Sequence, residues 1–210
     1  MKHICLIVNS VIISDAALNQ IASNKLVAYF LNFLVGCEGK LGSIGTMSNT
    51  KVFSDGEWWR LILHMYLHAG VLHMLFNVLV LLFAGRIVEK KLGSLLYLLL
   101  YHVMAIVNAI IMCLIFPDSV SVGASAGIFG MIGIVCVMKW KKDTVCNENL
   151  KKRELIYISI FSILSLVLGL ESFVTHLSAF GLGIIIGLLL QKINRSLTHN
   201  GDHSVTNRKE

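Results

Sequence analysis

The chain alternates long apolar runs with short polar or charged segments. An apolar run of about 17–25 residues is long enough to cross the hydrocarbon core of a bilayer as a helix. The first run is the weakest, because Asn24, Lys25 and Asn32 interrupt it. The pattern as a whole predicts an all-α membrane protein with a bundle of six transmembrane helices, at residues 20–36, 70–88, 94–116, 124–140, 155–171 and 175–191.

The same pattern divides the chain into three parts. Residues 1–19 form a short N-terminal segment, whose apolar stretch at 4–13 is too short to span a bilayer. Residues 20–192 form the six-helix domain. Residues 193–210 form a polar cytoplasmic tail, which its composition predicts to be disordered.

A long loop at residues 37–69 joins the first two predicted helices. Its stretch EWWRLILHMYLH carries Trp58 and Trp59, which suit the membrane–water interface, and Arg60, whose long side chain can reach water from within lipid. We expect this loop to lie partly in the outer leaflet, against the bundle. An ordinary amphipathic connector accounts for the same pattern.

Composition and charge support the membrane assignment and orient the bundle. Of the 210 residues 56% are hydrophobic and only 14% are charged, against about 25% charged in soluble domains. The net charge of +6 comes mostly from basic residues that flank apolar runs, with six in KWKKDTVCNENLKKRE and none in the loops FPDS and LESF. The positive-inside rule then places both termini in the cytoplasm of a multi-pass cell-membrane protein. The charge thus indicates topology in a lipid bilayer rather than a nucleic-acid partner.

The five cysteines show no spacing typical of a metal site or a disulfide framework, and we expect no metal and no cofactor. Polar residues within the apolar runs are more informative, because each needs a hydrogen-bonding partner in lipid. His73 and Asn77 are four residues apart and share a helix face, so both can donate hydrogen bonds into one cavity. Interhelical hydrogen bonds or bonds to the helix's own carbonyls account for His102, Asn108, Ser159, Ser162 and Ser165.

Ser125 stands at the start of the fourth run. This run of about 17 residues makes a helix of about 25 Å, shorter than the hydrocarbon core of about 30 Å. The helix is therefore expected to begin below the outer surface, so the polar backbone before it lines a cavity. Backbone N–H groups at such a helix start favour negative charge that develops beside Ser125.

His176 opens the sixth run. The small residues that follow it on one helix face, Ala179, Gly183 and Gly187, allow close approach of another helix. The best partner is the fourth run, with Gly127, Gly130 and Gly133. Each of these residues by itself fits a packing role. Together they predict a Ser125–His176 dyad, in which the imidazole activates the hydroxyl as a nucleophile.

At this point the sequence resembles the rhomboid family of intramembrane serine proteases. The matching segments are EWWR, HAGVLHMLFN, GRIVEKKLGS, GASAGIFGMIG and HLSAFGLG, in the order typical of the family, over residues 57 to about 187. The resemblance implies that Ser125 is the nucleophile and His176 the general base. It also implies an oxyanion hole formed by His73, Asn77 and the backbone N–H of Ser125.

The resemblance implies supporting roles for further residues. Gly123 would keep the loop tight beside the serine, Phe129 would stack on the catalytic histidine, and Glu89 would bond to Ser94 across the cytoplasmic turn. Trp59 and Arg60 would structure the first loop, and the remaining supporting positions are His68, Gly133 and Gly183. Two departures from the family pattern are Ala126 and Ala179, where glycine is usual.

Three functions are compatible with these observations. The first is a serine endopeptidase that cleaves transmembrane protein substrates near the outer membrane face. The second is a catalytically inactive relative that binds or chaperones membrane proteins, although inactive relatives typically lose the serine or the histidine. The third is a small transporter, which the lack of an intramembrane carboxylate and of an inverted repeat disfavours. The sequence sets neither the substrate nor the oligomeric state.

Overall fold

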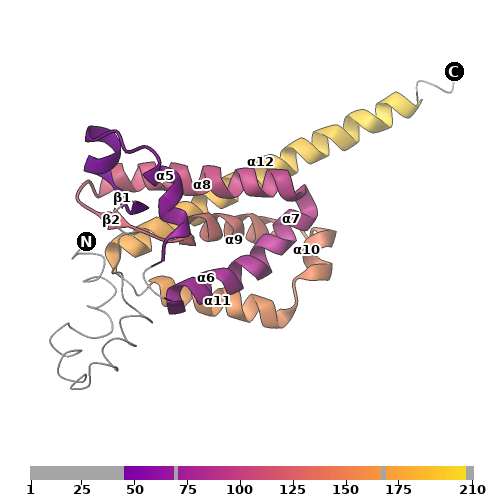
Figure 1. Cartoon of the computed structure of the whole chain (residues 1–210). Helices are drawn as coiled ribbons and strands as arrows, with labels where there is room; N and C mark the ends of the chain where they lie inside the picture. Colours follow the sequence, from indigo (N-terminus) through magenta and orange to yellow (C-terminus); the bar gives the residue numbers. More distant parts are fainter. Residues whose placement is uncertain (1–44, 69–70, 167–168, 207–210) are drawn as a thin grey trace.

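A computed structural model of the chain describes residues 45–68, 71–166 and 169–206 and is mostly helical (Figure 1). Its helices are η1 (Thr50–Ser54), α5 (Arg60–Leu63), η2 (His64–Tyr66), α6 (Val71–Val80), η3 (Leu81–Gly85), α7 (Arg86–Leu92), α8 (Ser94–Ile115), α9 (Ser125–Trp140), α10 (Thr144–Asn149), α11 (Lys152–Leu166) and α12 (Leu170–Thr206). Two short strands, β1 (Met47–Ser48) and β2 (Val120–Ser121), complete the described elements.

Three helices within the described residues are long and apolar enough to cross a membrane. They are Val71–Leu92, formed by α6, η3 and α7 in succession, Ser94–Ile115, and Leu170–Ile193 within α12. Together with the shorter α9 and with α11, they occupy five of the six predicted runs. The run at 20–36 and the segment 1–19 lie outside the described residues, so the count of six helices remains a prediction.

The helix α9 lies in the middle of the bundle (Figure 1). It contacts α8, α12, α7, α6 and η3, and 13 of its 16 residues are buried. Such a helix needs apolar or small side chains on every face, which explains its lack of an amphipathic pattern. Its length of about 24 Å is shorter than a bilayer core, in keeping with a start below the surface.

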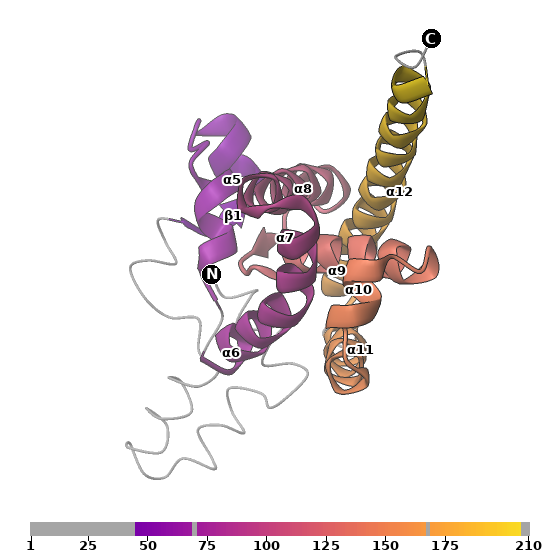
Figure 2. The same cartoon turned by 90° about the vertical axis from the view of Figure 1, so that its right-hand side faces the viewer.

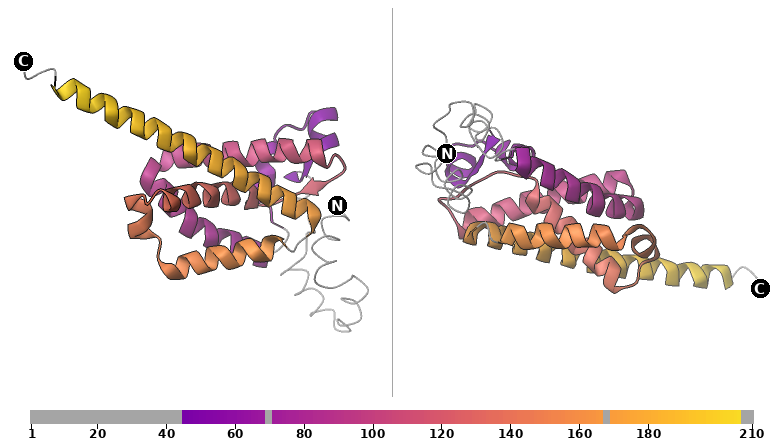
Figure 3. Two further views of the ribbon diagram at one scale, coloured as in Figure 1. Left: turned by 180° about the vertical axis from the view of Figure 1, so that it is seen from behind. Right: turned by 90° about the horizontal axis from the view of Figure 1, so that it is seen from below.

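The last helix corrects the prediction for the C-terminal part of the chain. The sequence predicts a helix over 175–191 and a disordered tail from 193, whereas α12 begins at Leu170 and continues to Thr206. Figure 3 shows this helix crossing the bundle and projecting well beyond it. Once a helix has formed, each further residue adds a hydrogen bond without a new nucleation cost, so it can extend past the apolar run.

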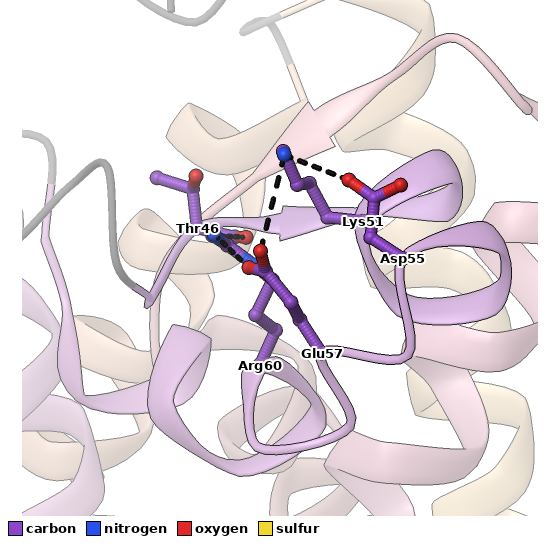
Figure 4. A network of polar contacts seen from close by, with 5 residues as sticks. All are labelled: Thr46, Lys51, Asp55, Glu57 and Arg60. Carbon is purple, nitrogen blue, oxygen red and sulfur yellow. Dashed lines mark hydrogen bonds and ion pairs between the residues drawn. The ribbon is translucent and has the colours of Figure 1, made fainter.

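The described part of the first loop is folded rather than a plain connector. Its strand β1 pairs with β2 in antiparallel fashion, Met47 opposite Ser121 and Ser48 opposite Val120. An ion-pair network then holds the loop together: Lys51 lies 2.7 Å from Asp55 and 3.9 Å from Glu57, and Glu57 pairs with the buried Arg60 (Figure 4). Its partial burial in lipid remains a prediction.

The opposite end of the bundle, which faces the viewer in Figure 2, contains α7 and α10. Here Gly93 adopts φ +81°, which lets the chain reverse between α7 and α8. Across this turn Ser94 Oγ donates a 2.7 Å hydrogen bond to Glu89, the bond that the family resemblance implies. Nearby ion pairs join Arg86 to Glu154 and Lys91 to Asp143, and tie α7 to the segments that follow α9.

Candidate active site

Ser125 is the first residue of α9 and is buried, with 9% of its surface exposed. Two residues before it, Gly123 has φ +124°, a conformation that side chains rarely adopt. A Cβ added to Gly123 would lie 2.9 Å from Cε1 of His73 and 3.9 Å from Oγ of Ser125. The structure therefore places both the His73 ring and the Ser125 hydroxyl within 4 Å of a position that only glycine suits.

His176 lies near the start of α12 and is 5% exposed. Its ring stacks on that of Phe129, with a centroid separation of 4.3 Å and an interplanar angle of 13°. Phe129 follows Ser125 by one turn on the same face of α9. The stacking therefore holds His176 on the face of α9 from which Ser125 projects.

The predicted close packing of α9 on α12 through small residues is confirmed for Gly130, Gly133 and Gly183, whereas Gly127, predicted to share this face, is directed at Tyr101 of α8. A Cβ at Gly133 would lie 2.9 Å from the backbone nitrogen of Ile184, and a Cβ at Gly183 would lie 2.7 Å from the carbonyl carbon of Gly130. These glycines bring the two helix backbones into direct contact. Ala179, at a position where glycine is usual in the family, is fully buried in the same interface region.

The two polar residues of α6 lie on one face, as their spacing predicts. Asn77 is buried, and its Nδ2 donates a 2.9 Å hydrogen bond to the backbone carbonyl of His73. Its Oδ1 has no partner among the residues that the structure describes. The ring of His68 lies edge-on to that of His73, with centroids 5.4 Å apart. The structure thus brings His73 beside Ser125 and places Asn77 one turn further along α6.

A cavity of about 30 Å³ adjoins Ser125 and is large enough to hold a water molecule. Its lining includes Ser125, Gly123, His64, Asn108 and Thr175. His64 is held by its Nδ1, 2.8 Å from the carbonyl oxygen of Arg60, and burial lowers the pKa of its ring. The carbonyl of His64 in turn accepts a 2.8 Å hydrogen bond from the backbone N–H of Gly123.

Arg60 and Trp59 lie at some distance from these reactive groups and hold the first loop together. Arg60 Nη1 donates a 2.9 Å hydrogen bond to the carbonyl of Thr46, next to strand β1 (Figure 4). The carbonyl of Trp59 accepts hydrogen bonds at the start of α5, while its side chain is half exposed. Both residues therefore lie where they shape the loop that packs over the cavity.

The sequence analysis does not single out His64, and it predicts for Asn108 only an interhelical hydrogen bond, which the structure confirms. The structure places both beside the cavity, and Asn108 bonds to α12 on either side of His176. His102 contacts the Tyr66 hydroxyl and the carbonyl of Leu98. In the sequence these residues are isolated polar positions. The helical periodicity does not show which neighbouring helix will supply the hydrogen-bonding partner of each.

The fold and the site together define a polytopic helical membrane protein with a buried serine and histidine on two closely packed helices. The Rhomboid domain family model matches residues 55–193, which include all of these groups. The chain therefore belongs to the rhomboid family.

Individual relatives agree with this assignment. The chain is 31% identical to "RHOMBOID-like protein 4" of Arabidopsis thaliana over 152 residues, which cover 71% of this chain and 38% of the relative. It is 31% identical to "Putative rhomboid protease YdcA" of Bacillus subtilis over 144 residues, 68% of this chain and 72% of the relative. Over 93 residues it is 39% identical to "Rhomboid protease GluP" of Bacillus subtilis, which cover 44% of this chain and 18% of the relative. The matched part of the chain covers half or less of the length of these plant relatives.

Proposed function

We propose that the protein is an intramembrane serine endopeptidase that uses a Ser125–His176 dyad. The observation that supports this most directly is the stacking of His176 on Phe129, one turn after Ser125, in a bundle of the rhomboid family. The substrates we propose are transmembrane segments of membrane proteins, cleaved near the outer face. Family relatives that carry the word protease in their names are consistent with this proposal.

In the proposed reaction, His176 accepts the proton of Ser125 as the Oγ attacks the carbonyl carbon of the scissile peptide bond. The tetrahedral intermediate carries a negative charge on the former carbonyl oxygen. The backbone N–H of Ser125, at the start of α9, together with His73 and Asn77 would stabilise that charge by hydrogen bonding. His176 then gives its proton to the leaving amine, which leaves an acyl ester on Ser125.

Hydrolysis of the ester completes the proposed cycle. A water molecule attacks the ester carbonyl while His176 accepts one of its protons, and a second tetrahedral intermediate forms at the same oxyanion position. Its collapse breaks the bond to Oγ, which recovers its proton from His176, and the product leaves with a new carboxyl group. Each proton transfer requires that the imidazole remains within reach of Oγ, which the packing of α9 against α12 favours.

The test uses the full chain purified in detergent and a fluorescent fluorophosphonate, which labels activated serines. We expect labelling of the wild type and of Ser121→Ala, because Ser121 also lines the cavity but is not the proposed nucleophile. Ser125→Ala and His176→Ala are expected to lose it. A folded wild type that is not labelled, or labelling that survives Ser125→Ala, would contradict the proposal. Capture of membrane proteins without labelling would instead support the inactive binding protein.

The proposed location is the cell membrane, with both termini in the cytoplasm. The basic residues Arg86, Lys90 and Lys91 lie on α7, at the end of the bundle opposite β1 and β2 (Figure 1). The positive-inside rule assigns that end to the cytoplasm. To test this orientation, Leu95 or Asp118 is replaced by cysteine, and intact cells are treated with a membrane-impermeant maleimide. We expect labelling at Asp118→Cys alone, and labelling at Leu95→Cys alone would invert the topology.

A further inference from the structure

Asn108 lies in the second half of α8, is 1% exposed, and bonds to the helix that carries His176. Its Nδ2 donates a hydrogen bond of 2.7 Å to Oγ of Ser178 and one of 3.2 Å to the carbonyl oxygen of Thr175. These two partners stand on either side of His176 in the sequence. A single buried amide group is therefore hydrogen-bonded to α12 at the turn that carries the proposed base.

The hydrogen bonds continue within α12 itself. Ser178 Oγ lies 2.7 Å from the carbonyl oxygen of Val174 and 3.1 Å from that of Thr175, and it donates to them. The amide of Asn108 thus bonds to a hydrogen-bond network in the first turns of α12, and not only to one freely rotating side chain. In a buried, low-dielectric setting such a network restricts both sliding and rotation of the helix.

Two different elements therefore control the position of the imidazole. Phe129 of α9 supports the face of the His176 ring, and Asn108 of α8 holds the backbone and a side chain next to it. The glycines between α9 and α12 set how closely these helices approach, but small residues make a smooth surface that permits sliding. Directional hydrogen bonds from α8 supply the missing constraint along and around the axis of α12.

We propose that Asn108 is a positioning residue for the reaction, which acts through Thr175 and Ser178 to place His176 against Ser125. This proposal rests on the proposed function. A displacement of reacting groups by about 1 Å can lower a rate by about 100-fold, so loss of this anchor is expected to affect the chemical step. Asn108 lines the small cavity beside Ser125, but it is 1% exposed and its Nδ2 is hydrogen-bonded to α12, so binding of a substrate segment is expected to change little.

The variants separate hydrogen bonding from packing. Asn108→Leu keeps the branching and the number of side-chain heavy atoms but has no polar atoms, and Asn108→Asp keeps the shape but replaces the donor by an acceptor. Ser178→Ala removes one of the two partners. Met104→Ala is the matched control, because Met104 is equally buried one turn away on α8 but packs against Gly130 of α9. Thermal unfolding midpoints of all variants are measured in the same detergent.

The first readout is the second-order rate of Ser125 labelling by the fluorophosphonate, followed against pH. We expect Asn108→Leu and Asn108→Asp to lower the plateau rate by 10- to 100-fold, in line with the cost of misplacement given above. We expect Ser178→Ala to lower it by a smaller factor, with no further loss when it is combined with Asn108→Leu. In proteoliposomes kcat for a transmembrane substrate should fall while KM stays within about twofold of the wild type.

Two results would overturn the proposal. One is a labelling rate for Asn108→Leu within about threefold of the wild type. The other is that the labelling rate of Asn108→Leu falls only in proportion to its unfolding midpoint, with the same proportion as in Met104→Ala. A purely structural role of Asn108 predicts that proportion.

A second readout does not depend on activity. Spin labels at the exposed positions Leu114 on α8 and Leu170 on α12 report the distance between these helices. We expect one narrow distance distribution in the wild type and a shifted or broadened one in Asn108→Leu, but not in Met104→Ala. An unchanged distribution refutes the anchoring role. Absence of labelling in the folded wild type refutes the proposed protease instead, so the two failures are distinguishable.

Discussion

The ring of His176 lies flat on the ring of Phe129, with their centroids 4.3 Å apart. Phe129 is in turn stacked on Phe161 of α11, at a centroid distance of 5.6 Å. Three helices therefore meet at this column of rings, one turn below Ser125. The stack fixes the plane of the imidazole, and the plane decides whether a ring nitrogen points to the serine hydroxyl.

Phe129→Ala is expected to lower the labelling rate of Ser125 by about tenfold or more, because it removes the surface that orients His176. Aromatic pairs contribute about 0.5–1.5 kcal/mol beyond their buried area, so Phe129→Tyr should retain most of the rate. Phe161→Ala is the control, because it removes a neighbour of Phe129 that is not the ring on which His176 stacks. A rate that falls equally in Phe129→Ala and Phe161→Ala would show that the column acts only through stability.

Gly183→Ala is expected to destabilise the bundle and lower activity together. The added methyl group would meet the backbone of Gly130, which cannot move without separating α9 from α12. Gly181→Ala, on the same helix, meets no atom within 4 Å and should leave the unfolding midpoint unchanged or slightly raised. Thermal unfolding in detergent and fluorophosphonate labelling measure both effects, and a Gly183→Ala midpoint equal to that of Gly181→Ala would contradict this packing.

Gly123→Ala is expected to reduce labelling strongly with a smaller effect on folding. Its φ of +124° strains any side chain, and the new methyl group would push against the His73 ring beside Ser125. Gly56 also has a positive φ, of +72°, but this value is near the left-handed region that side chains can adopt, and a Cβ there meets no atom within 4 Å. Gly56→Ala is therefore a control for a substitution at a positive φ away from the site, and equal labelling rates in the two variants would contradict the importance of the backbone at Gly123.

Arg60→Gln is expected to loosen the first loop, because it leaves Glu57 without its buried partner and weakens the contact to Thr46. Breaking a fully buried pair costs about 3–5 kcal/mol and an exposed pair contributes about 0–1 kcal/mol. Because Glu57 is 23% exposed, the cost of losing its pair with Arg60 is expected to lie between these limits. Lys51→Ala, which removes an exposed pair in the same network, should therefore have little effect. Limited proteolysis of the segment 45–68 measures the difference, and equal cleavage rates would place the stability of the loop elsewhere.

Much of the helical layout follows from the sequence. Long apolar runs form helices in lipid because the backbone must satisfy its own hydrogen bonds there, and the runs at 94–116 and 124–140 agree with α8 and α9 to within one residue. The helix boundaries are predicted less well where polarity changes gradually along the chain. The run at 155–171 corresponds to α11 at Lys152–Leu166, and α12 extends far beyond the apolar part of its sequence.

The sequence by itself determined the membrane character of this protein, the helix that begins at Ser125, and the residue types available for chemistry. Only the tertiary structure decided that Phe129 supports His176, that Gly123 lies close to both His73 and Ser125, and that Asn108 bonds to α12. The physical reason is that the formation of one helix depends on the order of apolar and polar residues along the chain, because its backbone hydrogen bonds are local. A contact between helices depends on the rotation and depth of both, which are set by the packing of the whole bundle.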